Sequence, residues 1–415
     1  MTPPHQAKSD WFLISSKALI FEILLQFIIG IILATQYSPG TGGYQSVVHF
    51  RSTFFGSFVS GIHYWGSMIL ILHSLAQVTV TLWTAKYREY PLRWLGTVLI
   101  FLTALGAQIT GNILPMDRHG VQTAVVETGL MGSIPVVGKI IRTIAVGGPT
   151  MNPATGTHWF RIHEFVITAL FIIGMTLIGR GSAKFRSKSD RLLALVPIFI
   201  LLLVAIAVKP PLGNPAQKLD FGEYNAYVSW YTWPMHGMLK LFENFSSSAG
   251  WIGFAVVPGL FVAFLFLVPV LDKLIKRVGI QVTFAIFAVG FLGAGFKYGG
   301  PIAALTGNRD PAPNNLATGP KRKVTPPNSA QLALIHQGQS LFNSIGCSGC
   351  HGQNGTNGSS GPNLTQLWQM HNTAWFAKYM HNPRSINPNS TMPAFSSLSA
   401  TQRNQIGTFL SYPMK

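Results

Sequence analysis

Acidic residues and cysteines are scarce in this sequence. Its 415 residues include 12 Asp and Glu, and charged residues make up only 10%, against about 25% in soluble proteins. Because 48% of the residues are hydrophobic, most of the chain is expected to face lipid. There are only two cysteines, Cys347 and Cys350, which excludes a disulfide framework elsewhere in the chain.

Basic residues, by contrast, are in excess: 30 Lys and Arg give a net charge of +18. Such an excess is typical of nucleic-acid binding, of contact with anionic lipid or of membrane topology. The basic residues lie in short loops between apolar runs, without a basic stripe that carries aromatic residues. We therefore expect no nucleic acid, and we assign the charge to topology.

Seven apolar runs are each near the roughly 20 residues that a helix needs to span the hydrocarbon core. They lie at 12–37, 54–83, 94–114, 159–179, 192–208, 251–271 and 280–298. The first is too long for the apolar core of a signal peptide, about 7 to 15 residues, so it is expected to remain as a membrane helix.

The loops on the N-terminal side of these runs are basic, which indicates a cytoplasmic N-terminus. Their basic residues are Lys86, Arg88, Arg93, Arg180, Lys184, Arg186, Lys188, Arg191, Lys273, Lys276 and Arg277. Seven crossings then place the C-terminus on the outer, periplasmic side of a bacterial or archaeal cytoplasmic membrane.

Near the C-terminus, Cys347, Cys350 and His351 form a Cys-x-x-Cys-His motif. In this arrangement two thiols form thioethers to haem and the histidine coordinates the iron. Zinc binding and thioredoxin-like chemistry are the alternatives for two cysteines at this spacing. The adjoining histidine favours one covalent c-type haem.

The second axial ligand of that iron is expected to be Met392, because a thioether there raises the reduction potential relative to a second imidazole. Met370 and Met380 lie in helix-like segments and are expected to be core residues. The sequences Gly338–Phe342 and Gly361–Leu364 resemble small class I cytochrome c domains, and the resemblance covers the whole C-terminal segment.

His63 lies inside the second apolar run, and His163 lies near the start of the fourth. Ionisable residues at membrane depth are functional candidates, although a structural hydrogen bond to a helix carbonyl is the alternative. One imidazole near the outer end of each of two antiparallel helices can clamp a porphyrin.

The sequence around these histidines has a recognisable pattern. It comprises Gln26, Gly30, Tyr37–Pro39, His63–Trp65, Gly106, Thr110–Gly111, Leu114–Asp117, Gly132–Gly138, Phe160–Val166, Gly213–Ala216 and Trp230–Tyr231. From about residue 17 to 298 it resembles the cytochrome b family of cytochrome bc complexes and its plastid-type counterpart. The resemblance implies that His63 and His163 ligate an outer b haem beside Gly30 and Gly106, and that Gly132–Gly138 is the family's short outer helix.

We therefore expect an all-α membrane protein of about seven transmembrane helices. A four-helix haem-binding bundle (1–185) is followed by a three-helix part (186–307), a Pro- and Asn-rich linker (308–328) and a small α-helical cytochrome c domain (329–415). This last domain contains no Asp or Glu.

One departure from the family concerns an inner b haem, which needs a histidine about 14 residues further along each ligand helix. Gln77 and Ile178 stand there. A second b haem is therefore doubtful, and its first candidate ligand is His73, about 15 Å along the helix from His63. Glu22 either serves an inner quinone or proton site or is paired within the bundle.

A second departure concerns quinol oxidation, which in the family uses a Pro-Glu-Trp-Tyr motif whose glutamate accepts a proton. Val228–Tyr231 stands there without a carboxylate. His236 either replaces it or is a structural interfacial histidine, the more ordinary role. Glu164 and Glu223 are further acids on the expected outer side, and His236 and Glu164 are weak catalytic candidates.

The resemblance implies a fused b- and c-haem subunit of a bc-type respiratory complex, part of a quinol:cytochrome c oxidoreductase-like enzyme. It would pass electrons, with quinol as the expected source, to an outer cytochrome. A Rieske iron–sulfur protein or another redox subunit, and a dimeric complex, are implied. The alternative is an anchor whose single b haem connects a non-quinol redox module to the c haem. The haem motif excludes a non-redox seven-helix protein.

Overall fold

The structure is a computed structural model. It describes residues 11–148, 153–180, 187–213, 215, 229–246, 249–299, 322–351, 355, 364–365, 367–386, 392 and 394–413. All regular elements in these residues are helices, so the expected all-α fold is confirmed.

Seven helices of the described residues are long and apolar enough to cross a membrane. They are Trp11–Gln36, Phe54–Trp83, Pro91–Ile113, Ala154–Gly179, Lys188–Ala207, Ile252–Leu271 and Arg277–Tyr298. Each contains most of one predicted apolar run. The fourth begins five residues earlier than predicted, because polar residues that precede the apolar run continue the same helix.

Local sequence signals fix where several helices begin. Thr53 caps α3 (Phe54–Trp83) by accepting a hydrogen bond from Gly56 N at 3.0 Å. Pro91 occupies the first turn of α4 (Pro91–Ile113), where its missing N–H costs no helical hydrogen bond. Asp117 caps α5 (Arg118–Gly132) through Gly120 N at 2.8 Å.

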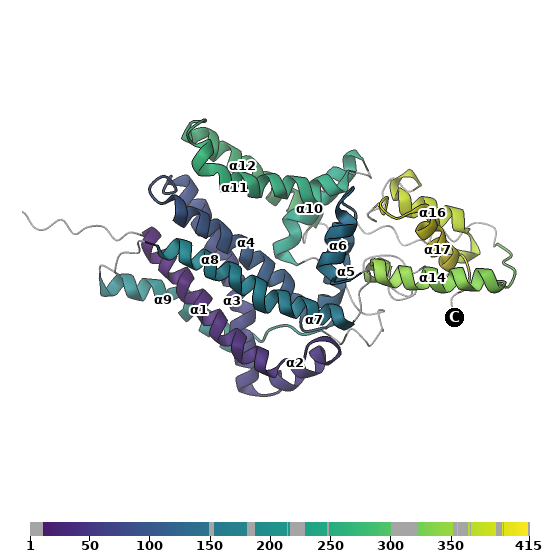
Figure 1. Ribbon diagram of the computed structural model, residues 1–415, viewed down its shortest axis with the longest axis horizontal. Helices are drawn as coiled ribbons and strands as arrows, with labels where there is room; N and C mark the ends of the chain where they lie inside the picture. The colour runs from purple at the N-terminus through teal and green to yellow at the C-terminus, as the bar shows by residue number, and fades with distance from the viewer. Residues whose placement is uncertain are drawn as a thin grey trace, which may run out of the picture. The chain divides into compact units, whose positions relative to one another are not determined.

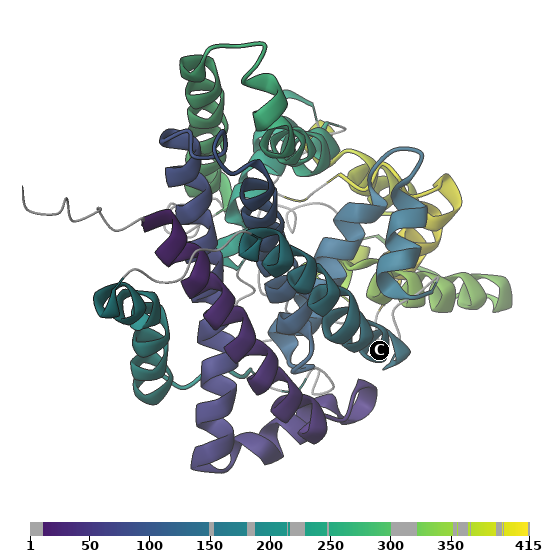
Figure 2. The ribbon, with the colours of Figure 1, turned by 60° about the vertical axis from the view of Figure 1, so that its left-hand side comes forward.

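The described residues form two compact units. The first comprises Met1–Met116, Gly156–Gly213 and Ala263–Phe284. In it α1 (Trp11–Gln36), α3, α4 and α8 (Thr168–Gly179) pack as a four-helix bundle, and α9 (Lys188–Ala207) covers α1 and α3 (Figure 1). Figure 2 shows α1 and α3 adjoining again in a turned view.

Within this bundle α4 and α8 approach closely. A Cβ atom on Gly96 would lie 2.8 Å from Ile178 Cγ2 and 2.9 Å from the carbonyl oxygen of Gly174. A Cβ atom on Gly174 would lie 2.6 Å from Ile100 Cγ1. The two glycines therefore allow near-backbone contact between the helices, which leaves little room between them at this level.

The second unit comprises Asp117–Thr155, Asn214–Val262 and Ala285–Lys415. Leu130 of α5, Leu239 of α10 (Trp233–Phe245) and Phe254 of the π-helical segment η5 (Ile252–Val256) form a buried apolar cluster. This cluster joins α5, which follows the third span, to α10 and to the beginning of the sixth span.

The segment Gly132–Gly138 is a turn and not the short helix that the resemblance implied. It connects α5 to α6 (Gly138–Val146), and Val136 has a φ of 67°, which a helix does not accommodate. A Cβ atom on Gly138 would lie 2.7 Å from the carbonyl oxygens of Met131 and Gly132. The glycine thus allows α6 to start against the end of α5.

The C-terminal part of the second unit contains α14 (Ser329–Ile345), α15 (Cys347–His351), α16 (Thr373–His381) and α17 (Ala400–Leu410). α17 packs against both α14 and α16 (Figure 1). Phe342 and Phe409 stack edge to face, with ring centroids 5.6 Å apart. Among the described residues, ten buried side chains form the small core of this part.

This small core extends further toward the N-terminus than the sequence predicts. Arg322, a residue of the predicted linker, donates hydrogen bonds to the carbonyl oxygens of His371 at 2.5 Å and Ser411 at 3.4 Å. The chain therefore joins the C-terminal helices by Arg322, seven residues before the predicted domain start.

Candidate functional site

His63 of α3 and His163 of the π-helical segment η2 (Ile162–Ile167) face each other in the first unit. Their ring centroids are 6.0 Å apart and their planes are inclined by 77°. Each nitrogen of a pair that ligates one metal ion lies about 2 Å from the metal, so the centroids of such a pair are also about 6 Å apart. The spacing fits an iron between the two rings.

The hydroxyl of Thr110 sets the proton position on His163. Its single hydrogen goes to the carbonyl oxygen of Gly106 at 2.8 Å, so its oxygen accepts from His163 Nδ1 at 2.8 Å. With Nδ1 protonated, the lone pair of neutral His163 is on Nε2. A second hydrogen bond of this kind commonly orients a metal-ligating histidine.

Two glycines lie beside these rings. A Cβ atom on Gly30 of α1 would lie 3.5 Å from His63 Cε1, and one on Gly111 of α4 would lie 3.0 Å from His163 Cε1. His63 Nδ1 is buried without a hydrogen-bond partner among the described residues. These features fit a large planar ligand between the rings. Gly111, rather than Gly106, approaches His163, while Gly106 contributes its carbonyl to Thr110.

At the other end of the same bundle, several polar side chains are joined by hydrogen bonds. Gln77 accepts from Ser15 Oγ at 2.6 Å and donates to Ser16 Oγ at 3.0 Å and Thr97 Oγ1 at 3.2 Å. Thr97 in turn donates to the carbonyl oxygen of Arg93 at 2.9 Å. We call Ser15, Ser16, Gln77 and Thr97 the Gln77 cluster. It satisfies both ends of the Gln77 amide.

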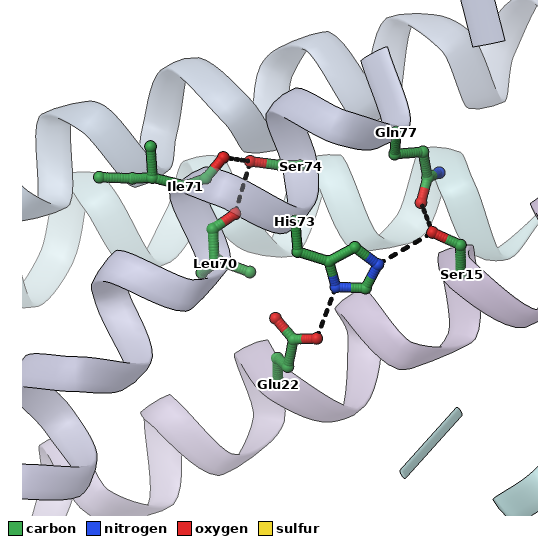
Figure 3. Close-up of polar contacts among 7 residues, drawn as sticks. All are labelled: Ser15, Glu22, Leu70, Ile71, His73, Ser74 and Gln77. Carbon is green, nitrogen blue, oxygen red and sulfur yellow. Dashed lines mark hydrogen bonds and ion pairs between the residues drawn. The ribbon is translucent and has the colours of Figure 1, made fainter. Parts of the chain in front are cut away.

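His73 and Glu22 adjoin this cluster (Figure 3). Ser15 donates its hydrogen to Gln77, so it accepts from His73 Nε2 at 2.9 Å. His73 Nδ1 lies 2.6 Å from Glu22 Oε1, a hydrogen bond only if a further proton is shared between them. The pair is then neutral overall, as a low-dielectric interior favours. Of the two expectations for Glu22, the structure shows the partner within the bundle.

The Gln77 cluster lies at positions that are offset by 14 residues from those around His63 and His163. Three of its members lie 14 residues from residues near the outer rings: Ser16 from Gly30, Gln77 from His63, and Thr97 from Gly111. Fourteen residues advance about 21 Å along a helix and return to nearly the same face. Hydroxyls and an amide therefore stand where the outer site has glycines and an imidazole, and Ile178 beside them is 0% exposed.

The C-terminal motif lies at the N-terminal side of the small core. Cys347 is buried in that core and His351 is 8% exposed at the end of α15. The side chain of Cys350 lies outside the described residues. Helix α15 places a thiol and the imidazole within two turns, the arrangement that covalent haem attachment requires.

The methionines of this part differ in burial. Met380 is 4% exposed within the core, as the sequence predicts, while Met392 and Met370 are partly buried at its edge. A partly buried thioether at the edge of a core can face a planar ligand, whereas Met380 is enclosed by side chains. Met392 remains the predicted axial ligand.

In the second unit, a carboxylate and an imidazole pair at depth. His236 Nε2 of α10 lies 2.9 Å from Glu127 Oε1 of α5, and the side chains are 12% and 4% exposed. His119 Nε2 lies 3.2 Å from Ser229 Oγ. Burial lowers the pKa of His119, partly offset by the negative charge of Asp117.

The sequence did not point to Glu127, although it is the single acid of α5. Glu164 is half-buried on η2 and makes no hydrogen bond or ion pair within the described residues. Glu223 and Val228 lie outside those residues. His236 therefore has a hydrogen-bond partner, whereas Glu164 has none within the described residues.

Two protein families match different parts of the chain. Residues 2–179 match the family described as Cytochrome b/b6/petB. Residues 333–410 match the family described as cytochrome c oxidase, cbb3-type, subunit III. The two matches cover the segments that carry the facing histidines and the Cys-x-x-Cys-His motif.

Individual relatives agree with the first match. The menaquinol:cytochrome c reductase cytochrome b subunit of Bacillus subtilis is 30% identical over 153 residues, 36% of this chain and 68% of that protein. Cytochrome b6 of Mastigocladus laminosus is 29% identical, over 37% of this chain and 73% of that protein. Cytochrome b of Cereibacter sphaeroides is 25% identical over 58% of this chain, and the chain spans 61% of that relative's length.

A solved structure described as a hyperthermophilic respiratory Complex III shares the fold. The TM-score is 0.51 at 15% sequence identity, over 72% of this chain and 92% of that one. At this identity the likeness concerns the arrangement of helices alone.

Proposed function

Because the chain belongs to the cytochrome b family and carries a cytochrome c domain at residues 333–410, we propose that it is the fused b- and c-haem electron-transfer subunit of a bc-type respiratory complex. Electrons from a membrane quinol reach the haems of this chain and then an outer cytochrome. The observation that carries the proposal is the facing pair His63 and His163 in a chain that also holds Cys347 and His351.

The proposed b-haem site is held by His63 and His163, with Gly30 and Gly111 leaving room for the ring and Thr110 orienting His163. A haem there would supply one-electron redox chemistry at a potential set by two imidazole ligands. The proposed c-haem site uses Cys347, Cys350, His351 and Met392.

We propose a single b haem per chain. An inner b haem does not fit the residues present, because Gln77 is satisfied by Ser15, Ser16 and Thr97. Ile178 is fully buried where a second imidazole would be needed. His73, the first candidate for an unusual ligand, has both ring nitrogens in contact with Ser15 and Glu22.

Pyridine haemochrome analysis of the purified protein is therefore expected to give a b to c ratio near one. The family's two-haem arrangement would give two. A ratio of two would contradict the single-haem proposal and require a ligand set outside the Gln77 cluster. A ratio near zero would contradict the proposed roles of His63 and His163.

A second candidate function is an anchor whose b haem connects a non-quinol redox module to the c haem. The observation that favours it is Ser229, which occupies the place of the family's proton-accepting glutamate. Reduction of the haems by hydroquinones separates the two candidates, since the anchor would respond only to its own donor.

The proposed topology has the N-terminus in the cytoplasm and the cytochrome c domain outside. Protease added to right-side-out vesicles is expected to release that domain by cleavage after Asn308, because Pro- and Asn-rich tethers expose their backbone. A haem-stained fragment in the supernatant is the measurement. Release of the domain only from inverted vesicles would contradict this topology and indicate the opposite orientation.

The proposed partners follow from the family. They are a Rieske iron–sulfur protein or another redox subunit, an outer cytochrome acceptor, and a second copy of the chain in a dimeric complex. Two cysteines committed to haem cannot also bind an iron–sulfur cluster, so that cofactor would belong to a partner.

A further inference from the structure

The segment Val228–Tyr231 has no carboxylate, but the helix α5 carries one, that of Glu127. We propose that His236 and Glu127 together accept the protons of a hydroquinone, in the role that a glutamate at position 229 would have. This inference rests on the proposed function and names its proton acceptor. Glu127 lies on α5 and His236 on α10, 109 residues apart in the sequence.

The geometry of the pair suits proton transfer. Glu127 Oε1 lies 2.9 Å from His236 Nε2, and both side chains are largely buried. With Glu127 ionised, Nε2 carries the hydrogen of this bond and Nδ1 has the lone pair. Neither side chain makes another hydrogen bond within the described residues, so Nδ1 is left for a substrate hydroxyl.

Close backbone contacts fix the helix that carries His236. A Cβ atom on the neighbouring Gly237 would lie 2.3 Å from the carbonyl oxygen of Ala294, and one on Gly253 would lie 2.1 Å from that of Met238. Any larger residue would force these segments apart. The imidazole is therefore held on a rigid element, as a group that must meet a substrate requires.

The surroundings of the pair combine apolar and polar groups. Leu130, Leu239 and Phe254 form the apolar cluster of the same helices. Ser229, in the motif itself, contacts His119. Sites for flat, lipid-soluble molecules such as a hydroquinone combine apolar side chains with a few polar groups, and these helices carry both kinds.

The two helices also lie on one side of the membrane. α5 follows the third span and α10 precedes the sixth. Spans that alternate in direction put both loop regions on the side of the C-terminus, where protons from hydroquinone oxidation would be released in the proposed topology.

Oxidation of a hydroquinone removes two electrons and two protons and leaves a quinone. The first O–H bond breaks with its proton going to His236 Nδ1, and the Glu127 carboxylate stabilises the resulting imidazolium. The second proton follows after the pair has released the first. The electrons leave one at a time to acceptors of the haem and iron–sulfur classes.

The test uses the assembled complex in membranes, with a short-chain ubiquinol and a short-chain menaquinol as donors. Haem reduction is followed optically in the wild type and in the variants Glu127→Gln, His236→Gln and the double variant. Loss of a proton acceptor is expected to slow reduction by about 10²- to 10⁴-fold. The double variant should be no slower than the slower single variant, because the two groups act as one unit.

A structural role would not reproduce the expected pattern of rescue. Glu127→Asp, which keeps a carboxylate, should recover part of the rate that Glu127→Gln loses.

The matched control is Glu243→Gln, which removes a buried carboxylate that pairs with Lys240 on the same helix at 2.9 Å. It should keep the wild-type rate. All variants should keep the b and c haem content that dithionite reveals. An active wild type with unchanged rates in Glu127→Gln and His236→Gln would overturn the role of the pair alone. Haems that dithionite reduces but neither hydroquinone does would overturn the proposed function and the pair with it.

Discussion

Replacement of His63 or His163 by alanine is expected to abolish the b-type absorption band completely while the c-type band keeps its full amplitude. A low-spin haem needs a strong ligand on each face, and the two rings face each other at a centroid distance of 6.0 Å. Loss of either ring leaves one face without a ligand. Reduced-minus-oxidised difference spectra of membranes measure both bands in one experiment.

Two histidines serve as controls for this experiment. His49→Ala changes an exposed histidine of α2 (Gly43–Arg51) and should leave both bands unchanged. His73→Ala removes the partner of Glu22 and should also leave the b band in place. A b band that survives in His163→Ala and disappears in His73→Ala would reassign the ligand.

Replacement of Met392 by alanine is expected to leave the c haem covalently attached and lower its reduction potential on the order of 100 mV or more, since axial ligands set haem potentials over about 0.8 V. The thioethers depend on the two cysteines and are unaffected. A redox titration followed at the c band measures the potential. Loss of the sulfur–iron band in the near infrared reports the ligand itself.

The comparison variants are Met370→Leu and Met380→Leu. Both conserve volume, so they should change the potential little and stability by less than about 1.5 kcal/mol. A potential that falls in Met370→Leu and stays constant in Met392→Ala would move the ligand to the other side chain at the core edge.

The membrane helices could be predicted from the sequence because their signal is local. A run of about 20 apolar residues has few alternatives to a spanning helix, and all seven predicted runs lie in such helices. The turn at Gly132–Gly138 was predicted wrongly. The prediction of a helix there rested on the family resemblance, although Pro135 and the glycines of the segment favour a turn.

Contacts between segments that are far apart in the chain could not be predicted from the sequence. Thr110 orients His163 from 53 residues away, and Glu127 meets His236 across 109 residues. A lone acid in α5 has no periodic or motif signal that would identify its partner. His63 and His163 could be proposed from the sequence because ionisable residues at membrane depth are functional candidates and the residues around them resemble the family.

In the part of the bundle around Gln77, one feature could be predicted from the sequence and another could not. The missing histidines at Gln77 and Ile178 were visible in the sequence. That Ser16 and Thr97 replace the glycines of the outer site, and complete a network around Gln77, emerged only with the hydrogen bonds.

The Gln77 cluster has a consequence for energy conservation. An electron that crosses a membrane against its electric potential requires about 2.3 kcal/mol per 100 mV, and in a two-haem bundle the step between haems contributes to that cost. In the proposed arrangement the hydrogen-bonded Gln77 cluster stands in the half of the bundle that would hold the second haem. In a chain with only the outer b haem, electrons move on one side of the insulating layer. The protons and the electrons of a quinol are then released on the same side, so turnover would build a pH difference and not a voltage.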